Sequence, residues 1–285
     1  MNELIRTLQS VDIAIYDFLG RFAGNWVVAR LVSHEETNNI LKGGLFFAFF
    51  WYAWFRVRPD QAKQRKAIIA ILIGAVLAII VARTVAFAVP FRVRPMDDPH
   101  LTHPVYAVAS NADLENWSSF PSDSAAYFFA LAFGLAYLFR RLTIPVTLYT
   151  SLWICLPRIY LGIHYTSDIV VGGGIGILTV WLSLHSGFVN SAIADRALKA
   201  AETGPQWFYA IAFLVSFEMA TVFAELRDVG RGILHWTLFA FHVQYKHHSS
   251  PFDEWGGLCV MAILFLTGCY AALVLRRKYR GEIHR

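Results

Sequence analysis

Long apolar runs separated by short polar connections dominate the pattern along this chain. From about residue 35 onward, successive runs approach the ~20 residues that a helix needs to cross a hydrocarbon core. A helix satisfies its backbone hydrogen bonds internally, so it is the structure that such runs adopt in lipid. The pattern predicts an all-α, polytopic transmembrane bundle of about six to seven spans, at roughly 38–55, 66–89, 121–139, 143–161, 168–186, 206–226 and 255–275.

The two ends of the chain differ from this core. Residues 1–34 place charges among Leu, Ile and Phe at helical intervals, which is typical of a helix that lies in the membrane interface. Residues 35–226 are predicted to form the membrane-embedded core. Residues 227–285 are predicted to form an outward amphipathic segment, rich in His and aromatic residues, followed by an additional C-terminal span.

Basic residues give the orientation of the spans. They gather in the loop at 56–66, at 140–141, at 196–199 and in the tail at 276–285. Alternating spans bring these clusters to one face, which the positive-inside rule assigns to the cytoplasm. The loops at about 90–120, 156–167 and 227–254 then face outward.

Composition agrees with a membrane protein and gives no support for a nucleic-acid-binding protein or for a protein built on cysteine-based sites. Hydrophobic residues make up 56% of the chain. The net charge of +5 comes from clusters at span ends rather than from one basic face, so no nucleic-acid binding is predicted. The three cysteines lie inside apolar runs without metal-ligand spacing, so neither a disulfide framework nor a zinc site is predicted. No other metal and no cofactor is expected. Small residues at the start of the fifth span predict close helix packing, at Gly172, Gly173, Gly174 and Gly176.

Three outward segments carry residues that suit phosphate chemistry. In the first, Arg92 and Arg94 could present forked donors to an oxyanion. In the second, the run Pro121-Ser122-Asp123-Ser124 reads as a helix start, with Pro in the first turn, whose free N–H groups could bind an anion. The third joins Arg158, His164 and Asp168 in one loop.

His164 and Asp168 form the most specific pair. They are four residues apart, so on a helical turn the carboxylate could accept the proton of one ring nitrogen and leave the other as a lone pair. This arrangement predicts His164 as a nucleophile. An ordinary capped helix and an interfacial histidine remain the alternatives for each segment taken alone.

Together these residues resemble the type-2 phosphatidic acid phosphatase superfamily of membrane lipid phosphatases, over about residues 83–176. The family pattern is Lys, six residues and Arg-Pro; then Pro-Ser-Gly-His; then Ser-Arg, five residues, His, three residues and Asp. The residues that fall on it are Arg94, Pro95, Pro121, Ser122, Arg158, His164 and Asp168. The departures are Phe87 for Lys, Asp123 for Gly, Ser124 for the second-motif His and Pro157 for Ser.

The resemblance implies that His164 forms a phosphohistidine, with Asp168 orienting it and with Arg94 and Arg158 clamping the phosphoryl group. The acid that protonates the leaving group is missing at Ser124, and Asp123, His100 or His103 could replace it. Arg83, one helical turn before Phe87, or Arg92 could replace the missing Lys. Protonation of the leaving group by a general acid is worth ~100- to 10,000-fold in rate. A phosphate monoester leaving from a diphosphate needs this protonation least.

The predicted function is therefore removal of phosphate from a lipid diphosphate, such as a polyprenyl diphosphate, at the outward face of the membrane. The resemblance implies that this is a bacterial inner membrane. Two alternatives stay open: a phosphotransferase that passes the phosphoryl group to a lipid or sugar hydroxyl, and a protein that binds or transports a phospholipid or lipid carrier without turnover. Glu218, inside the sixth span, is expected to form a structural ion pair or hydrogen bond, with Arg83 or Arg227 as partner.

Overall fold

The computed structural model describes residues 2–22, 25–101, 117–187, 189–224 and 226, and within these ranges every regular element is helical. Residues 1–109 and 118–220 form one compact unit, and residues 110–117 and 221–285 form another. All helices named below lie in the first unit. The segment 227–285, with its predicted additional span, lies outside the described residues, as do His103 and Arg227.

Three helices that pack against one another form the centre of this unit: α4 (Gln61–Ala88), α5 (Asp123–Leu138) and α8 (Thr166–His185). Helix α8 approaches α5 closely because Gly172 and Gly176 face it. An added Cβ at these two positions would collide with the carbonyl oxygens of Ser122 and Ala126. The predicted small-residue packing is confirmed here and at Gly173, which faces the ring of Phe129, but is wrong for Gly174, whose added Cβ would meet no described atom.

The remaining helices follow the predicted apolar runs, except for two helical segments, Val189–Ala194 and Asp195–Thr203, which form where a basic loop was predicted. A π-helical turn, Ile40–Gly44, leads into α3 (Leu45–Phe55). The segment Arg140–Tyr160 is helical throughout, as a 3₁₀ turn, α6 (Thr143–Tyr149), a π-helical stretch (Thr150–Cys155) and α7 (Leu156–Tyr160). A third π-helical stretch, Val189–Ala194, leads into α9 (Asp195–Thr203), and α10 (Pro205–Ala220) follows.

Length and composition identify the helices that can cross a membrane. Gln61–Ala88, Arg140–Tyr160 and Thr166–His185 are long and apolar enough, and Ile40–Phe55 and Asp123–Leu138 are shorter apolar helices. The fold is thus an all-α membrane helical bundle, as predicted, while the number of six to seven spans stays a prediction. Helix α10 contains Glu218, which is partly buried, and ends at Ala220, short of the predicted residue 226.

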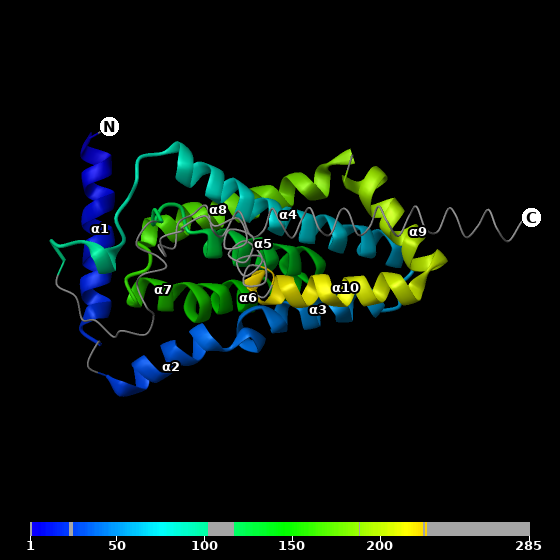
Figure 1. Ribbon diagram of the computed structural model, residues 1–285, viewed down its shortest axis with the longest axis horizontal. Coiled ribbons are helices and arrows are strands. Elements are labelled where there is room, and N and C mark those ends of the chain that lie inside the picture. The colour runs from blue at the N-terminus through cyan, green and yellow to red at the C-terminus, as the bar shows by residue number, and fades with distance from the viewer. Residues whose placement is uncertain (1, 23–24, 102–116, 188, 225, 227–285) are drawn as a thin grey trace, which may run out of the picture. The chain divides into compact units, whose positions relative to one another are not determined.

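The N-terminal segment forms two helices rather than the single interfacial helix predicted. Helix α1 (Asn2–Gly20) lies across one end of the bundle, transverse to the central helices (Figure 1), and α2 (Trp26–Thr37) follows it. Helix α1 contacts α7 and α8. It buries Asp12 and Tyr16 against the bundle and leaves an apolar face exposed, at Leu8, Val11 and Phe18.

The bundle has two distinct ends. Helix α4 ends, and α5 and α8 begin, at the end where α1 lies, whereas α9 lies at the opposite end (Figure 1). Among the described residues, the opposite end carries the basic clusters at 56–66, 140–141 and 196–199, and there an ion pair between Lys66 and Asp195 joins the start of α4 to α9. The three segments that were predicted to share one side of the membrane therefore lie at one end of the bundle, away from the basic loops.

Candidate active site

Backbone hydrogen bonds join the three predicted segments to one another. The N–H of Ser119 donates to the carbonyl of Arg92 at 2.9 Å, and that of Ser122 donates to the carbonyl of Asp168 at 3.1 Å. The N–H of Met96 donates to the carbonyl of Gly162 at 3.0 Å. Gly162 has a φ of +70°, a conformation that favours glycine, at the turn that leads to His164. Segments that are distant in sequence thus form one hydrogen-bonded assembly.

His164 is buried at the centre of this assembly, with a relative exposure of 3%. Its Nδ1 atom lies 2.8 Å from the main-chain carbonyl oxygen of Ser119. A carbonyl oxygen can only accept, so Nδ1 carries the proton of the neutral ring and Nε2 keeps a lone pair. Burial lowers the pKa of His164 from 6.5 to about 3, and the positive charges of Arg94 and Arg158 act in the same direction. The imidazole is therefore neutral at physiological pH.

Asp168 does not take the part predicted for it. Its nearer oxygen, Oδ2, lies 3.9 Å from Nδ1 of His164, beyond hydrogen-bond distance. That oxygen accepts the N–H of Tyr165 at 2.8 Å, and Oδ1 accepts from Nη1 of Arg92 at 2.5 Å. The prediction that Asp168 accepts the imidazole proton is wrong, because the carbonyl of Ser119 holds that place. Asp168 instead caps the start of α8 and fixes the loop that contains His164.

Two arginines bring positive charge to the imidazole. Arg94 is buried and its Nη1 donates to the carbonyl of Ile163 at 2.8 Å, directly before His164. Burial lowers the pKa of Arg94, although a guanidinium remains charged in proteins. Arg158 accepts the N–H groups of Ile163 and His164 at its own carbonyl, at 3.0 and 3.2 Å, and its charge acts on the ring. Both predicted phosphate-clamping residues therefore lie next to His164.

Arg83 forms an ion pair with Asp123 at the start of α5. The predicted substitute for the missing Lys thus reaches the second segment. Asp123 also accepts the N–H of Ser124 at 2.8 Å, and its negative charge acts on His164. A carboxylate with two hydrogen-bonding partners therefore lies within the electrostatic reach of His164.

The helix start at 121–124 confirms the expected Ser or Asp cap and differs from the prediction in the place of its proline. Ser122 is the N-cap, with its hydroxyl accepting the N–H of Ala125 at 3.3 Å, and Pro121 precedes the cap instead of occupying the first turn. The N–H groups of Ser124 and Ala125 are thus already accepted by side chains of the same turn. An oxyanion would reach the N–H of Ser124 only by displacing the carboxylate of Asp123.

Arg92 is held by protein carboxylates, which does not match the predicted role in substrate binding. Its Nη2 donates to Asp12 at 2.8 Å, and its Nη1 donates to Asp168 and to Ser167. The guanidinium lies over the ring of Tyr165, 4.1 Å from the centroid. Arg92 thus ties α1 and α8 together beside the site.

Residues 89–192, which contain all three segments, match the family model described as the PAP2 superfamily. The chain carries a PAP2 superfamily domain. It is also similar to the bacitracin transport permease protein BcrC of Bacillus licheniformis, with 26% identity over 143 residues. That alignment covers 49% of this chain and 64% of BcrC, so the chain spans less than two thirds of the relative that it matches. No solved structure matches the chain.

The PAP2 domain does not contain every residue that supports the site. Arg83, in α4, and Asp12, in α1, both precede residue 89. Sequence reasoning missed Asp12 and Ser119. The only signal for Asp12 was an acidic residue at the helical spacing of Ile15, Tyr16 and Leu19 on an otherwise apolar face. Ser119 acts through its carbonyl, which every residue has, so its side chain gave no signal.

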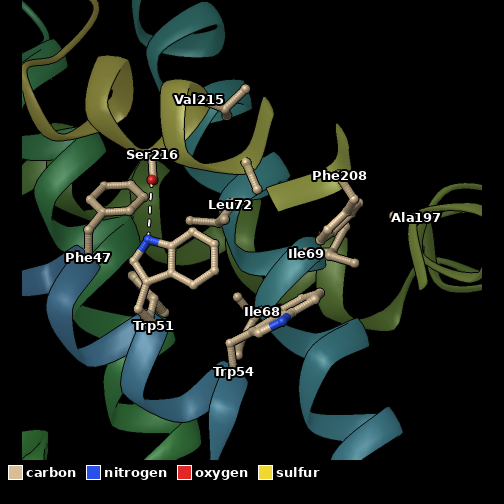
Figure 2. A pocket seen from close by; sticks show the side chains of 12 residues that line it. Phe47, Trp51, Trp54, Ile68, Ile69, Leu72, Ala197, Phe208, Val215 and Ser216 are labelled. Atoms are coloured by element: carbon tan, nitrogen blue, oxygen red, sulfur yellow. Dashed lines mark hydrogen bonds between the residues drawn. The ribbon is translucent and has the colours of Figure 1, made fainter. Parts of the chain in front are cut away.

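An apolar cavity of about 150 Å³ lies elsewhere in the bundle, between α3, α4, α9 and α10. Figure 2 shows Trp51 and Trp54 at its wall, with the indole N–H of Trp51 donating to the hydroxyl of Ser216 at 3.2 Å. None of the three segments around His164 contributes a residue to its lining. The cavity and the PAP2 site are therefore separate features of this chain.

Proposed function

We propose that this chain is an integral membrane lipid phosphatase that removes phosphate from a lipid diphosphate, such as a polyprenyl diphosphate, by way of a phosphohistidine at His164. One observation carries the proposal. The imidazole is neutral and buried, donates Nδ1–H to the carbonyl of Ser119 and keeps a lone pair at Nε2, next to the charges of Arg94 and Arg158. A nucleophile beside cations is what attack on a phosphoryl group requires.

In the first step, Nε2 attacks the terminal phosphorus and a P–N bond forms. The bond between phosphorus and the bridging oxygen breaks, and its electron pair leaves with the lipid monophosphate. The ring gains positive charge, which the carbonyl of Ser119 stabilises through the Nδ1–H bond. Arg94 and Arg158 balance the negative charge of the phosphoryl oxygens.

The residue at position 124 supports the choice of a diphosphate. Ser124 cannot donate a proton with the acidity of an imidazolium, and an alkoxide leaving group needs such a proton in the transition state. A phosphate monoester is a much weaker base, so it leaves without that help. The site as built thus favours a lipid diphosphate over a lipid monophosphate.

In the second step, water attacks the phosphohistidine, the P–N bond breaks and Nε2 regains its lone pair. We assign the water's proton to an oxygen of the departing phosphate, because the carboxylate of Asp123 is already paired with Arg83 and accepts the N–H of Ser124. His100, another predicted proton carrier, is exposed, and His103 lies outside the described residues. Inorganic phosphate is the second product.

The site is proposed to face the periplasm or the cell exterior, in a bacterial inner membrane. The described basic clusters at 56–66, 140–141 and 196–199, which favour the cytoplasm, lie at the end of the bundle opposite to the starts of α5 and α8, which flank the site (Figure 1). A relative from Bacillus licheniformis supports the bacterial setting. The lipid substrate would then present its diphosphate at the outer membrane surface.

The test is phosphate release by the purified full chain in detergent, from a panel of lipid monophosphates and diphosphates, with His164→Ala as the variant. We expect release from diphosphates by the native chain and a fall of at least ~1,000-fold in the variant, because the nucleophile is gone. The control is His185→Ala, an exposed histidine at the C-terminal end of α8, which should retain activity. Equal inactivity of native chain and variant on every substrate would refute the proposal and favour a binding protein.

The phosphotransferase alternative shares the first step and differs only in the acceptor. Adding a lipid or sugar hydroxyl at fixed diphosphate concentration separates the two. If turnover needs no acceptor and all phosphate appears in solution, the hydrolase is supported. Turnover that depends on the acceptor, with the phosphoryl group recovered on it, would assign the transferase.

A further inference from the structure

Helix α1 contributes a buried carboxylate to the surroundings of His164, although α1 precedes the PAP2 domain in the chain. Asp12 has a relative exposure of 3%. A buried carboxylate is costly unless donors surround it, and it then fixes their positions. The donors that surround Asp12 come from the first and third segments of the site.

The first group of contacts is with the start of α8. Oδ1 of Asp12 accepts the N–H of Ser167 at 2.8 Å, and Oδ2 accepts the Ser167 hydroxyl at 2.5 Å. Ser167 lies in the first turn of α8, where N–H groups lack partners within the helix and where a negative charge is favoured by the helix dipole. Asp12 thus acts as a cap for α8 that is supplied by another helix.

The second contact continues toward the nucleophile through Arg92. Nη2 of Arg92 donates to Asp12 at 2.8 Å, while Nη1 donates to Ser167 at 2.8 Å and to Asp168 at 2.5 Å. Asp168 in turn accepts the N–H of Tyr165, the residue after His164, at 2.8 Å. A continuous series of charged hydrogen bonds therefore runs from Asp12 to the loop that holds the imidazole.

Packing holds Asp12 in this position. Tyr16, one helical turn later, is buried, and Ile15 and Leu19 pack against a cluster of Ala125, Cys155, Ile159 and Ile169. The cluster joins α5, α7 and α8, the helices that carry the second and third segments. Helix α1 is therefore docked on the site rather than resting beside it.

We propose that Asp12 is a positioning residue of the PAP2 site: it fixes Arg92 and the start of α8, and through Asp168 it sets the place of the His164 imidazole. Asp12 acts through these residues and does not touch the substrate. Its loss would let Arg92 turn and would leave the N–H of Ser167 without its acceptor. For catalysis, this inference rests on the proposed phosphatase function.

Kinetics of Asp12→Asn provide the first test. Asparagine keeps the size but places a neutral amide before Arg92, so the imidazole loses its alignment while Arg94 and Arg158 remain. We expect kcat to fall about 10- to 100-fold, the effect of a misplacement on the scale of 1 Å, with KM unchanged or lower. Asp17→Asn, the same change at an exposed position of α1, should behave as the native chain does.

Amide hydrogen exchange provides a second readout that does not depend on activity. In Asp12→Asn we expect faster exchange at residues 163–168 and native rates in the middle of α4 and α5, because only the cap and the loop are released. Ser167→Ala is a milder second variant, which removes one hydroxyl and no charge, and should lower kcat several-fold with the same local pattern. Asp12→Glu keeps the negative charge on a longer side chain, so it should retain part of the kcat that Asp12→Asn loses.

The possible failures are distinguishable. A native chain that releases no phosphate from any lipid refutes the proposed function, while exchange at 163–168 still decides the structural part of the inference. An active native chain with unchanged kcat and unchanged exchange in Asp12→Asn overturns the positioning role. Faster exchange throughout the chain, or a raised KM at native kcat, also overturns it, because these indicate general destabilisation or a binding role.

Discussion

The Nδ1 atom of His164 donates to the main-chain carbonyl of Ser119 at 2.8 Å. The tautomer with a free Nε2 is therefore set by the backbone of the second segment rather than by a carboxylate. A carbonyl orients the ring without holding a proton of its own at any working pH. This relationship separates the role of Asp168, which fixes the loop, from the choice of tautomer.

The lowered pKa of His164 makes stability depend on pH in a defined direction. Burial, together with Arg94, lowers the pKa from 6.5 to about 3 in the folded protein. Between these pH values the unfolded chain binds a proton at this ring that the folded chain does not, so folding stability falls as the pH decreases from about 6.5 toward 3. We expect the Tm in detergent to drop less between pH 7.5 and pH 5 in His164→Gln than in the native chain.

The control for this experiment is His100→Gln, since His100 is exposed. Its Tm should follow the pH dependence of the native chain. An identical pH dependence in the native chain and in His164→Gln would show that the buried ring does not contribute. Carboxylates that titrate in the same range are common to all three proteins and cancel in the comparison.

Restoring the missing acid should change the substrate range. Ser124 lies in the first turn of α5, next to Asp123, at the position of the family's second-motif histidine. In Ser124→His we expect hydrolysis of lipid monophosphates to rise by up to ~100-fold, because an imidazolium can protonate an alkoxide leaving group. The rate on lipid diphosphates should change little. A parallel rise on both substrates, or on diphosphates alone, would contradict the explanation of the diphosphate preference.

Two glycines of α8 offer a matched test of how the helices position the site. An Ala at Gly172 would collide with the carbonyl of Ser122, whereas an Ala at Gly174 would meet no described atom. We expect Gly172→Ala to destabilise the fold by about 1–3 kcal/mol through overpacking and to lower kcat, because the N–H of Ser122 bonds the carbonyl of Asp168 across the same contact. Gly174→Ala should leave kcat unchanged, as thermal unfolding and phosphate release can show.

The local pattern of the sequence predicted most of the helices. The runs at 38–55, 66–89, 121–139, 143–161 and 168–186 correspond closely to Ile40–Phe55, Gln61–Ala88, Asp123–Leu138, Arg140–Tyr160 and Thr166–His185. Hydrophobic runs suffice here because lipid admits only helices that satisfy their own backbone. The break of the N-terminal segment into α1 and α2 was missed, since both pieces are amphipathic and no proline marks the boundary.

The set of helices and the residues that suit phosphate could therefore be predicted from the chain alone, because periodicity, charge and motif spacing are local properties. How these residues are used depends on contacts that form when the helices pack. Ser119 rather than Asp168 accepts the imidazole proton, and Arg92 binds Asp12 and Asp168. Both outcomes follow from contacts between residues that are 45 to 155 positions apart in the chain. In addition, the acceptor of the imidazole proton is a main-chain carbonyl, which every residue has and which a sequence pattern therefore cannot reveal.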